Sequence, residues 1–306
     1  MKKESFPGRP IRLILGVPPG SASDILARAL APALSERLRQ PVTVDMHLGE
    51  SGVSGARLVA GSQADGYTLF MTTLGIHALG PSLRRAQPYD VVNDFSPVSL
   101  VARCPLLLAV HPSLAAHSLD ELTLLARRRP GELTFASSAI GGAPHLAAEL
   151  YMKMVKVDMT HICYERTQQL FADLVDGRIS LSFNNIMSML PLLSTGKLRG
   201  IAVTSATRLS IAPHLPTVAE SGLAGYEITN WLGIVAPARV DPEIIARLNG
   251  AIVGALQADD VKKNLAACGM EIVGSSASEF ARHIRSELAR WAPVVRDCIA
   301  GNAVRP

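Results

Sequence analysis

The segment from residue 11 to residue 38 constrains the fold of this chain most, because it joins an apolar strand to an amphipathic helix through a loop of small residues. Ile11-Arg12-Leu13-Ile14-Leu15 is bulky and partly β-branched, which is typical of a buried strand. Leucines then recur at every fourth position, the spacing of one helix face, at Leu26, Leu30, Leu34 and Leu38. We therefore predict a strand that leads directly into a helix, the repeating unit of an α/β sheet.

The loop between them has the composition of an anion-binding turn. It reads Gly16-Val17-Pro18-Pro19-Gly20-Ser21-Ala22-Ser23-Asp24, and its candidate ligand-binding residues are Pro19, Gly20, Ser21, Ser23 and Asp24. The prolines prevent helix formation, the second glycine permits a positive φ, and the serines or the aspartate can cap the helix. The first N–H groups of a helix favour a carboxylate or phosphate. An ordinary capped turn explains the same residues equally well.

The rest of the chain continues the alternation of strands and helices, which predicts a mostly parallel α/β sheet. The predicted strands are 11–16, 41–45, 67–72, 97–102, 105–110, 132–136, 158–162, 179–183, 198–204 and 232–236. The predicted helices are 23–38, 52–60, 118–129, 144–155, 167–176, 186–193, 216–221, 241–257, 259–268 and 276–299.

Two long extended segments, 96–110 and 225–235, are predicted crossings between two domains, for which 306 residues are sufficient. If both cross, the first domain is discontinuous and holds both termini. The predicted boundaries are 1–102 with 227–306 for the first lobe, and 103–226 for the second, inserted lobe. The loops at the carboxyl ends of both sheets then face a cleft. Trp231, in the second crossing, either walls this cleft or packs the hinge.

A second loop repeats the chemistry of the first one. Small residues, hydroxyls, glycines and a proline separate the strand predicted near 132–136 from the next helix. Two such loops in the two halves of a cleft favour an anionic ligand gripped from both sides. The candidate ligand-binding residues here are Ser137, Ser138, Gly141, Gly142 and His145.

Other candidates stand where further predicted strands end. Tyr164 can donate to a carboxylate or serve as a packing residue. Asn184 and Asn185 can donate to a ligand or form a turn before the next helix. Thr73 and His77 follow a strand of the first lobe, where the histidine either binds ligand or lines the cleft without a role.

Composition and motifs argue against several other classes of function. The formal net charge is only +4, from 30 Lys and Arg against 26 Asp and Glu, and no basic stripe with interleaved aromatics predicts nucleic-acid binding. Cys104, Cys163, Cys268 and Cys298 are widely separated, so we expect free thiols rather than a metal site or a disulfide. We expect no metal, no cofactor and no enzyme activity, because no nucleophile elbow, phosphate loop or zinc motif is present.

Several ordered blocks resemble the substrate-binding proteins of tripartite tricarboxylate transporters, the Bug proteins of β-proteobacteria. The resemblance covers about residues 9 to 300. The blocks include Arg9-Pro10-Ile11-Arg12-Leu13-Ile14, Asp65-Gly66-Tyr67-Thr68-Leu69, His145-Leu146-Ala147-Ala148-Glu149-Leu150, Gly196-Lys197-Leu198-Arg199-Gly200 and Leu215-Pro216-Thr217-Val218-Ala219-Glu220-Ser221-Gly222.

The resemblance implies a type II periplasmic-binding-protein fold, in which two α/β lobes joined by two crossover strands close on a small organic carboxylate. It implies that backbone N–H groups, hydroxyls and ordered waters bind this ligand, with little use of Arg side chains. It also implies a monomer in the periplasm, with a removed signal peptide, that delivers its ligand to the membrane permease subunits. Two alternatives are a sensor of the same fold that signals to a partner protein and, as the third choice, a hydrolase.

The chain departs from the family pattern inside the predicted ligand loops. Ser21 stands where a second glycine is usual, and Cys163-Tyr164-Glu165-Arg166 keeps only the tyrosine of the usual Pro-Tyr-Lys-Gly. The usual loop Arg and Pro are absent from Met46-His47-Leu48-Gly49-Glu50-Ser51-Gly52. The sequence therefore leaves the identity of the ligand open, among dicarboxylates, amino acids, aromatic acids and neutral molecules.

Overall fold

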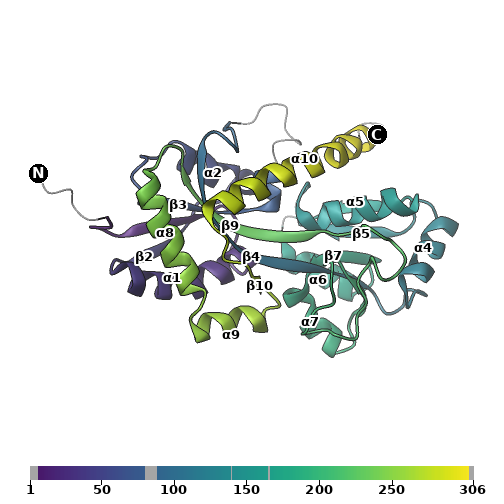
Figure 1. Ribbon diagram of the computed structural model, residues 1–306. Coiled ribbons are helices and arrows are strands. Elements are labelled where there is room, and N and C mark those ends of the chain that lie inside the picture. The colour runs from purple at the N-terminus through teal and green to yellow at the C-terminus, as the bar shows by residue number, and fades with distance from the viewer. Residues whose placement is uncertain (1–5, 80–87, 139, 165, 303–306) are drawn as a thin grey trace, which may run out of the picture. The chain divides into compact units, whose positions relative to one another are not determined.

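The computed structural model describes residues 6–79, 88–138, 140–164 and 166–302 (Figure 1). The chain forms two compact units. Unit 1 comprises Met1–Arg103, Trp231–Ala266 and Met270–Pro306, and unit 2 comprises Cys104–Asn230 and Ala267–Gly269. That these ranges behave as the two lobes of a closing receptor remains a prediction.

Unit 1 contains a mixed sheet whose strands follow the order β2-β1-β3-β9-β4, with β10 paired to β4. Strand β1 pairs in parallel with both β2 and β3, whereas β9 runs antiparallel to β3. The carboxyl ends of β1, β2 and β3 therefore meet at one edge of the sheet. The bounds are β1 Ile11–Leu15, β2 Val42–Met46, β3 Thr68–Thr73, β4 Phe95–Val110, β9 Thr229–Pro237 and β10 Glu271–Ile272.

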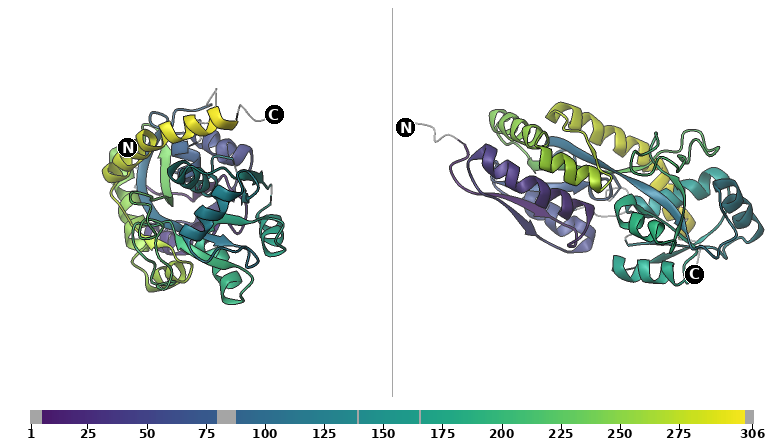
Figure 2. Two further views of the ribbon diagram at one scale, coloured as in Figure 1. Left: turned by 90° about the vertical axis from the view of Figure 1, so that its right-hand side faces the viewer. Right: turned by 90° about the horizontal axis from the view of Figure 1, so that it is seen from below.

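The helices of unit 1 cover this sheet. The four leucines of the first predicted helix are all buried, as their spacing requires, and this helix packs against α8 (Figure 1). The long C-terminal helix α10 is yellow-green to yellow in both views of Figure 2. The bounds are α1 Ala22–Leu38, η1 Glu50–Gly52, α2 Val53–Ala60, η2 Gly75–Leu79, α8 Pro242–Ala255, α9 Asp259–Ala267 and α10 Ala277–Asn302.

Unit 2 is built on strands in the order β4-β7-β5-β6, with β8 also paired to β4. Strand β5 pairs in parallel with β6 and β7, so these three strands also end at one edge. The strand bounds are β5 Thr134–Ser137, β6 Thr160–Cys163, β7 Leu181–Asn185 and β8 Arg199–Val203. The helix bounds are α4 Leu119–Arg128, α5 Ala143–Val155, α6 Thr167–Val175 and α7 Ile186–Ser194.

Three predicted elements, two strands and one helix, differ from the structure. The strands predicted at 97–102 and 105–110 are one continuous strand, β4. Pro105 does not interrupt this strand, because it lies between the β4 residues that pair with β10 and those that pair with β7.

The helix predicted at 216–221 is a turn instead. Thr217 forms a bridge with Val203 of β8, and a reciprocal pair of hydrogen bonds joins Thr217 to Glu220. The segment 217–222 thus starts with a capping box, as a helix does, but its first residue is bridged to the sheet. Gly222, with φ at +103°, ends the segment after one turn. The short strand β10 and the π-helical turn η2 were not predicted.

A buried carboxylate fixes α10 against β9 within unit 1. Glu287 Oε2 accepts hydrogen bonds from the indole N–H groups of Trp231 at 3.2 Å and Trp291 at 3.1 Å. Trp231 is buried and meets the rings of Phe280 and His283 edge-on. The residue is therefore a packing anchor of unit 1.

We expect Gly233→Ala to destabilise the protein, because a Cβ at this position of β9 would lie 2.1 Å from Phe280 Cζ. The ring must move in a closely packed interior, at a cost of roughly 1–3 kcal/mol. Gly250→Ala on α8 is the matched control, since a Cβ there meets nothing within 4 Å, and it should stabilise by roughly 0.5–1 kcal/mol. Urea unfolding of both variants tests this, and equal midpoints would contradict it.

Candidate functional site

The loops that follow β1, β2 and β3 are in direct contact with one another. A Cβ on Gly16 would lie 2.7 Å from Gly52 Cα, and one on Gly52 would lie 2.5 Å from Ile76 Cδ1. The backbone N–H of His47 also donates to the carbonyl of Leu15 at 2.8 Å. Glycine is required where backbones approach this closely, so the three loops form one joined surface at this edge.

The N-terminus of α1 is capped by its own side chains. Ser21 Oγ accepts from the N–H of Asp24 at 3.3 Å, and Asp24 Oδ2 accepts from the N–H of Gly20 at 2.9 Å. Asp24 Oδ1 also pairs with Arg28 Nε at 2.7 Å. Both side chains and the Gly20 amide are thus engaged within the chain, as in an ordinary capped turn. Of the predicted donors, the backbone N–H of Ser23 makes no hydrogen bond with any residue that the structure describes.

The other predicted residues of this loop have the expected backbone. Pro19 and Gly20 are exposed, and Gly20 adopts a positive φ of +76°. The side chain of Ser23 is buried. Of the hydroxyl and carboxyl candidates in this loop, Ser23 and Asp24 are thus buried and Ser21 is half-buried.

At the end of β3, the two predicted residues are buried and hydrogen-bonded locally. Thr73 Oγ1 accepts from the N–H of Ile76 at 3.3 Å, and His77 Nδ1 lies 3.0 Å from Thr72 Oγ1. The His77 ring is fully buried and contacts the ring of Phe95. Burial lowers the pKa of His77 to about 4, so this imidazole is neutral at pH 7.

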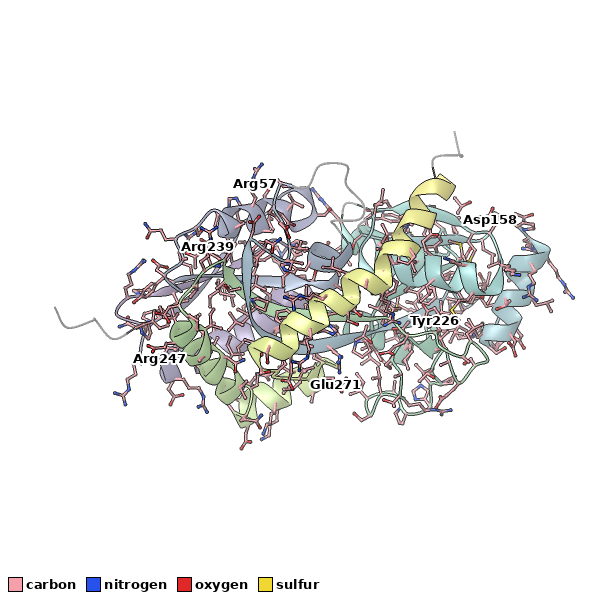
Figure 3. All side chains as sticks on the ribbon, turned by 45° about the horizontal axis from the view of Figure 1, so that its top comes forward. Arg57, Asp158, Tyr226, Arg239, Arg247 and Glu271 are labelled. Atoms are coloured by element: carbon pink, nitrogen blue, oxygen red, sulfur yellow. The ribbon has the colours of Figure 1, made fainter. Side chains whose placement is uncertain are left out.

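In unit 2, the turn between β5 and α5 has an open helix end. Gly142 is the N-cap residue of α5, and no side chain caps this helix. Gly141 has a positive φ of +75°, and Ser138 is exposed. The helix is held in place by the buried Tyr226, labelled in Figure 3, whose hydroxyl donates to the carbonyl of Ala147 at 2.8 Å. A fixed and uncapped helix end is suited to an anionic group.

His145, in the first turn of α5, hydrogen-bonds this turn. Its Nδ1 accepts from the N–H of Gly141 at 3.2 Å, and its Nε2 lies 3.4 Å from Glu149 Oε1. The Gly141 amide, a predicted ligand donor, is therefore used inside the chain. His145 is almost fully buried and does not present its ring to solvent.

His161 on β6 is a site residue that the sequence analysis missed. Its Nε2 lies 2.8 Å from Oγ of the buried Ser137, and its ring lies 4.3 Å from that of His145. Burial first and then His145 lower the pKa of His161 to about 4, with Glu149 opposing the change. Only the parallel register that sets Phe135 beside His161 brings these residues together, and no local motif signals it.

The Tyr164 side chain is bonded to α6, the helix that follows it in the chain. Its hydroxyl donates to Asp173 Oδ2 at 2.8 Å, and its N–H donates to the carbonyl of Ser137. Burial first and then Asp173 raise the pKa of Tyr164 to about 12. The Tyr164 hydroxyl is therefore already used in a hydrogen bond to Asp173 of α6.

The two asparagines at the end of β7 carry buried polar atoms without partners. Asn184 Oδ1 accepts from the N–H of Asn185 at 2.9 Å. Asn184 Nδ2 and Asn185 Oδ1 are enclosed and bond to no residue that the structure describes. A buried unsatisfied polar group costs roughly 1–3 kcal/mol, so a hydrogen bond to either atom from outside the chain would be favourable.

Among the described residues, no group of three His, Cys, Asp or Glu side chains is arranged to hold a metal ion. Cys104, Cys163 and Cys268 are not in disulfide bonds, and burial raises the pKa of Cys104 to about 12. The side chain of Cys298 lies outside the described part of the chain. In the same part, every helix is too short or too polar to cross a membrane.

The fold is that of a periplasmic solute-binding protein. A family model described as the tripartite tricarboxylate transporter family receptor matches residues 26–299, and the chain belongs to this family. Protein BugT of Bordetella pertussis is 37% identical over 295 residues, which cover 96% of this chain and 90% of BugT.

Solved structures of similar proteins have the same fold. The structure of R. palustris Rpa4515 with adipate has a TM-score of 0.88 at 38% identity and covers 95% of this chain and 97% of its own. MatC from Rhodopseudomonas palustris with bound malate has a TM-score of 0.86 at 28% identity, with coverage of 95% and 100%. The predicted type II fold and the predicted Bug-type receptor family are therefore confirmed. The predicted ligand contacts remain predictions.

We expect the protein to lose stability as the pH falls from 6.5 to 4, and His77→Asn to reduce this loss. The unfolded chain takes up a proton at His77 near pH 6.5, whereas the folded protein does so only near pH 4. For a fully buried imidazole this difference amounts to up to about 3 kcal/mol. Urea unfolding at pH 7 and pH 4.5 measures it. The contributions of His161 and His283, whose pKa values are also lowered, cancel in the comparison with wild type. Parallel pH curves would contradict the assignment.

Proposed function

We propose that this protein is an extracytoplasmic solute receptor that binds a small organic carboxylate and delivers it to the membrane permease of a tripartite tricarboxylate transporter. Membership of the receptor family supports the class of function. Two similar proteins were solved with adipate and with malate, which supports a dicarboxylate as the ligand.

The observation that carries the proposal is the set of open hydrogen-bonding groups at one edge of unit 2. The uncapped N-terminus of α5 follows β5, and Asn184, whose Nδ2 has no partner among the described residues, lies at the end of the neighbouring parallel strand β7. A carboxylate accepts hydrogen bonds only, so backbone and amide N–H donors at one edge match its chemistry. Tyr164 and Ser138 flank the same edge as secondary candidates.

Unit 1 carries its own candidate anion-binding loop after β1. Because Ser21 and Asp24 cap α1, their contribution is to hold the loop, while the neighbouring amides are the donors. Thr73 and His77 support the loop after β3 in the same way.

The periplasmic location and the permease partner are proposed from family membership alone. A receptor needs no catalytic group, and we propose none for this chain. Co-purification with the permease subunits encoded near its gene tests the transport role, and recovery of a sensor kinase instead would favour signalling.

We expect adipate or malate to bind wild-type protein and Asn184→Leu to weaken that binding at least tenfold. Loss of a hydrogen bond to a charged ligand costs roughly 1.5–3 kcal/mol. The amide Nδ2 that is removed has no partner, so the unliganded variant should lose only the hydrogen bond from the Asn185 N–H to Asn184 Oδ1, about 0.5–1.5 kcal/mol. Isothermal titration calorimetry and urea unfolding measure the two quantities.

Asn249→Leu is the matched control. Asn249 Nδ2 donates to the carbonyls of Val98 and Ser275, both at 2.8 Å, so this amide is satisfied. Its loss should lower stability by roughly 2 kcal/mol and leave ligand affinity unchanged. If Asn184→Leu lowers stability but not affinity, the amide is structural and the proposed site is wrong.

A further inference from the structure

Two imidazole rings of unit 2 contact each other beside the turn between β5 and α5. The ring centroids of His145 and His161 lie 4.3 Å apart, and His161 stacks on Phe135 at 4.8 Å with an angle of 23°. His145 comes from α5 and His161 from β6. Residues from two elements are thus packed as one group of rings.

Each ring holds one end of the same turn. His161 Nε2 bonds Ser137 Oγ at 2.8 Å, where β5 ends, and His145 Nδ1 accepts the N–H of Gly141 at 3.2 Å, just before α5 begins. Ser137 and Gly141 are both buried. Glycine adopts positive and negative φ about equally readily, so Gly141 alone does not fix the turn. Its hydrogen bond to His145 holds the observed conformation, with φ at +75°.

The hydrogen bond from Gly141 defines the tautomer of His145. A ring nitrogen that accepts an N–H bond carries no proton, so the proton of the neutral ring is on Nε2. That nitrogen faces Glu149 Oε1 at 3.4 Å, and a carboxylate favours a proton there. The ring is therefore held by a hydrogen bond at Nδ1 alone, because Nε2 is buried and has no hydrogen-bond partner among the described residues.

We propose that His145 and His161 act as positioning residues, a two-histidine clamp that holds Ser137 and Gly141 so that the amides at the start of α5 are preorganised for the ligand. This inference rests on the proposed function, because the clamp serves the carboxylate site of unit 2. Preorganisation raises affinity by removing the entropic cost of ordering the turn when the ligand binds.

The test compares aromatic and hydrogen-bonding replacements. His145→Phe keeps a ring but removes the acceptor for Gly141, whereas His145→Asn offers an amide oxygen in place of Nδ1. We expect affinity for adipate or malate to fall at least tenfold in His145→Phe and to recover to within about threefold of wild type in His145→Asn. His161→Phe and His161→Gln should form a similar pair, because glutamine can still bond Ser137.

A second readout needs no ligand. The amide of Gly141 should be protected from hydrogen exchange in wild type and in His145→Asn, and should lose protection in His145→Phe. If wild type binds no carboxylate at all, the proposed function fails, while this measurement still tests the clamp. Unchanged protection in His145→Phe would overturn the clamp, as would lost protection with unchanged affinity in a protein that binds ligand.

His111 is the matched control. Its Nδ1 also accepts a backbone N–H at 3.2 Å, from Ser113, and lies 2.7 Å from Ser113 Oγ. It follows β4, which is antiparallel to β7, so it stands at the opposite edge of the sheet from Ser137. His111→Phe should expose the Ser113 amide to exchange and leave affinity unchanged. An equal loss of affinity in this variant would show a general effect on unit 2 and overturn the proposal.

Discussion

Parallel pairing of neighbouring strands is the constraint on which the proposed site depends. Because β5 pairs in parallel with β6 and β7, the turns that follow all three strands emerge at one edge of unit 2. The same pairing of β1 with β2 and β3 joins three loops in unit 1, where Gly16 and Gly52 touch through their backbones. Helices that begin at such an edge bring their free N–H groups to it, which is where open α/β sheets bind their ligands.

Two loops of similar composition differ in how the following helix is capped. In unit 1, Ser21 and Asp24 satisfy the amides of their own loop, so side-chain carboxylate oxygen already stands where an anion would accept. In unit 2, Gly142 leaves α5 without a side-chain cap, and His145 takes only the amide of Gly141. The electrostatic field of the second helix end is therefore available to a ligand, whereas that of the first is partly used within the protein.

Local patterns predicted most elements because each pattern has a local physical cause. The leucines of α1 repeat with the helical period and are buried accordingly. The prediction failed at 216–221, where a bridge between Thr217 and Val203 of β8 outweighs one turn of helix. It also divided β4 at Pro105, since the sequence does not reveal that this residue lies between two sets of pairing partners. The wrong elements are those in which a distant strand determines the backbone.

The sequence by itself determined the class of this protein: its alternating strands and helices, its small-residue loops and the ordered blocks of the receptor family, confirmed by the family match over 26–299. Only the tertiary structure decided which polar groups remain free. Tyr164 is engaged by Asp173, the Gly141 amide by His145 and the Ser137 hydroxyl by His161, whereas Asn184 Nδ2 has no partner among the described residues. The physical reason is that each polar group can form only a limited number of hydrogen bonds. A donor or acceptor bonds the neighbour that packing brings to it, and several of these neighbours come from other strands and helices.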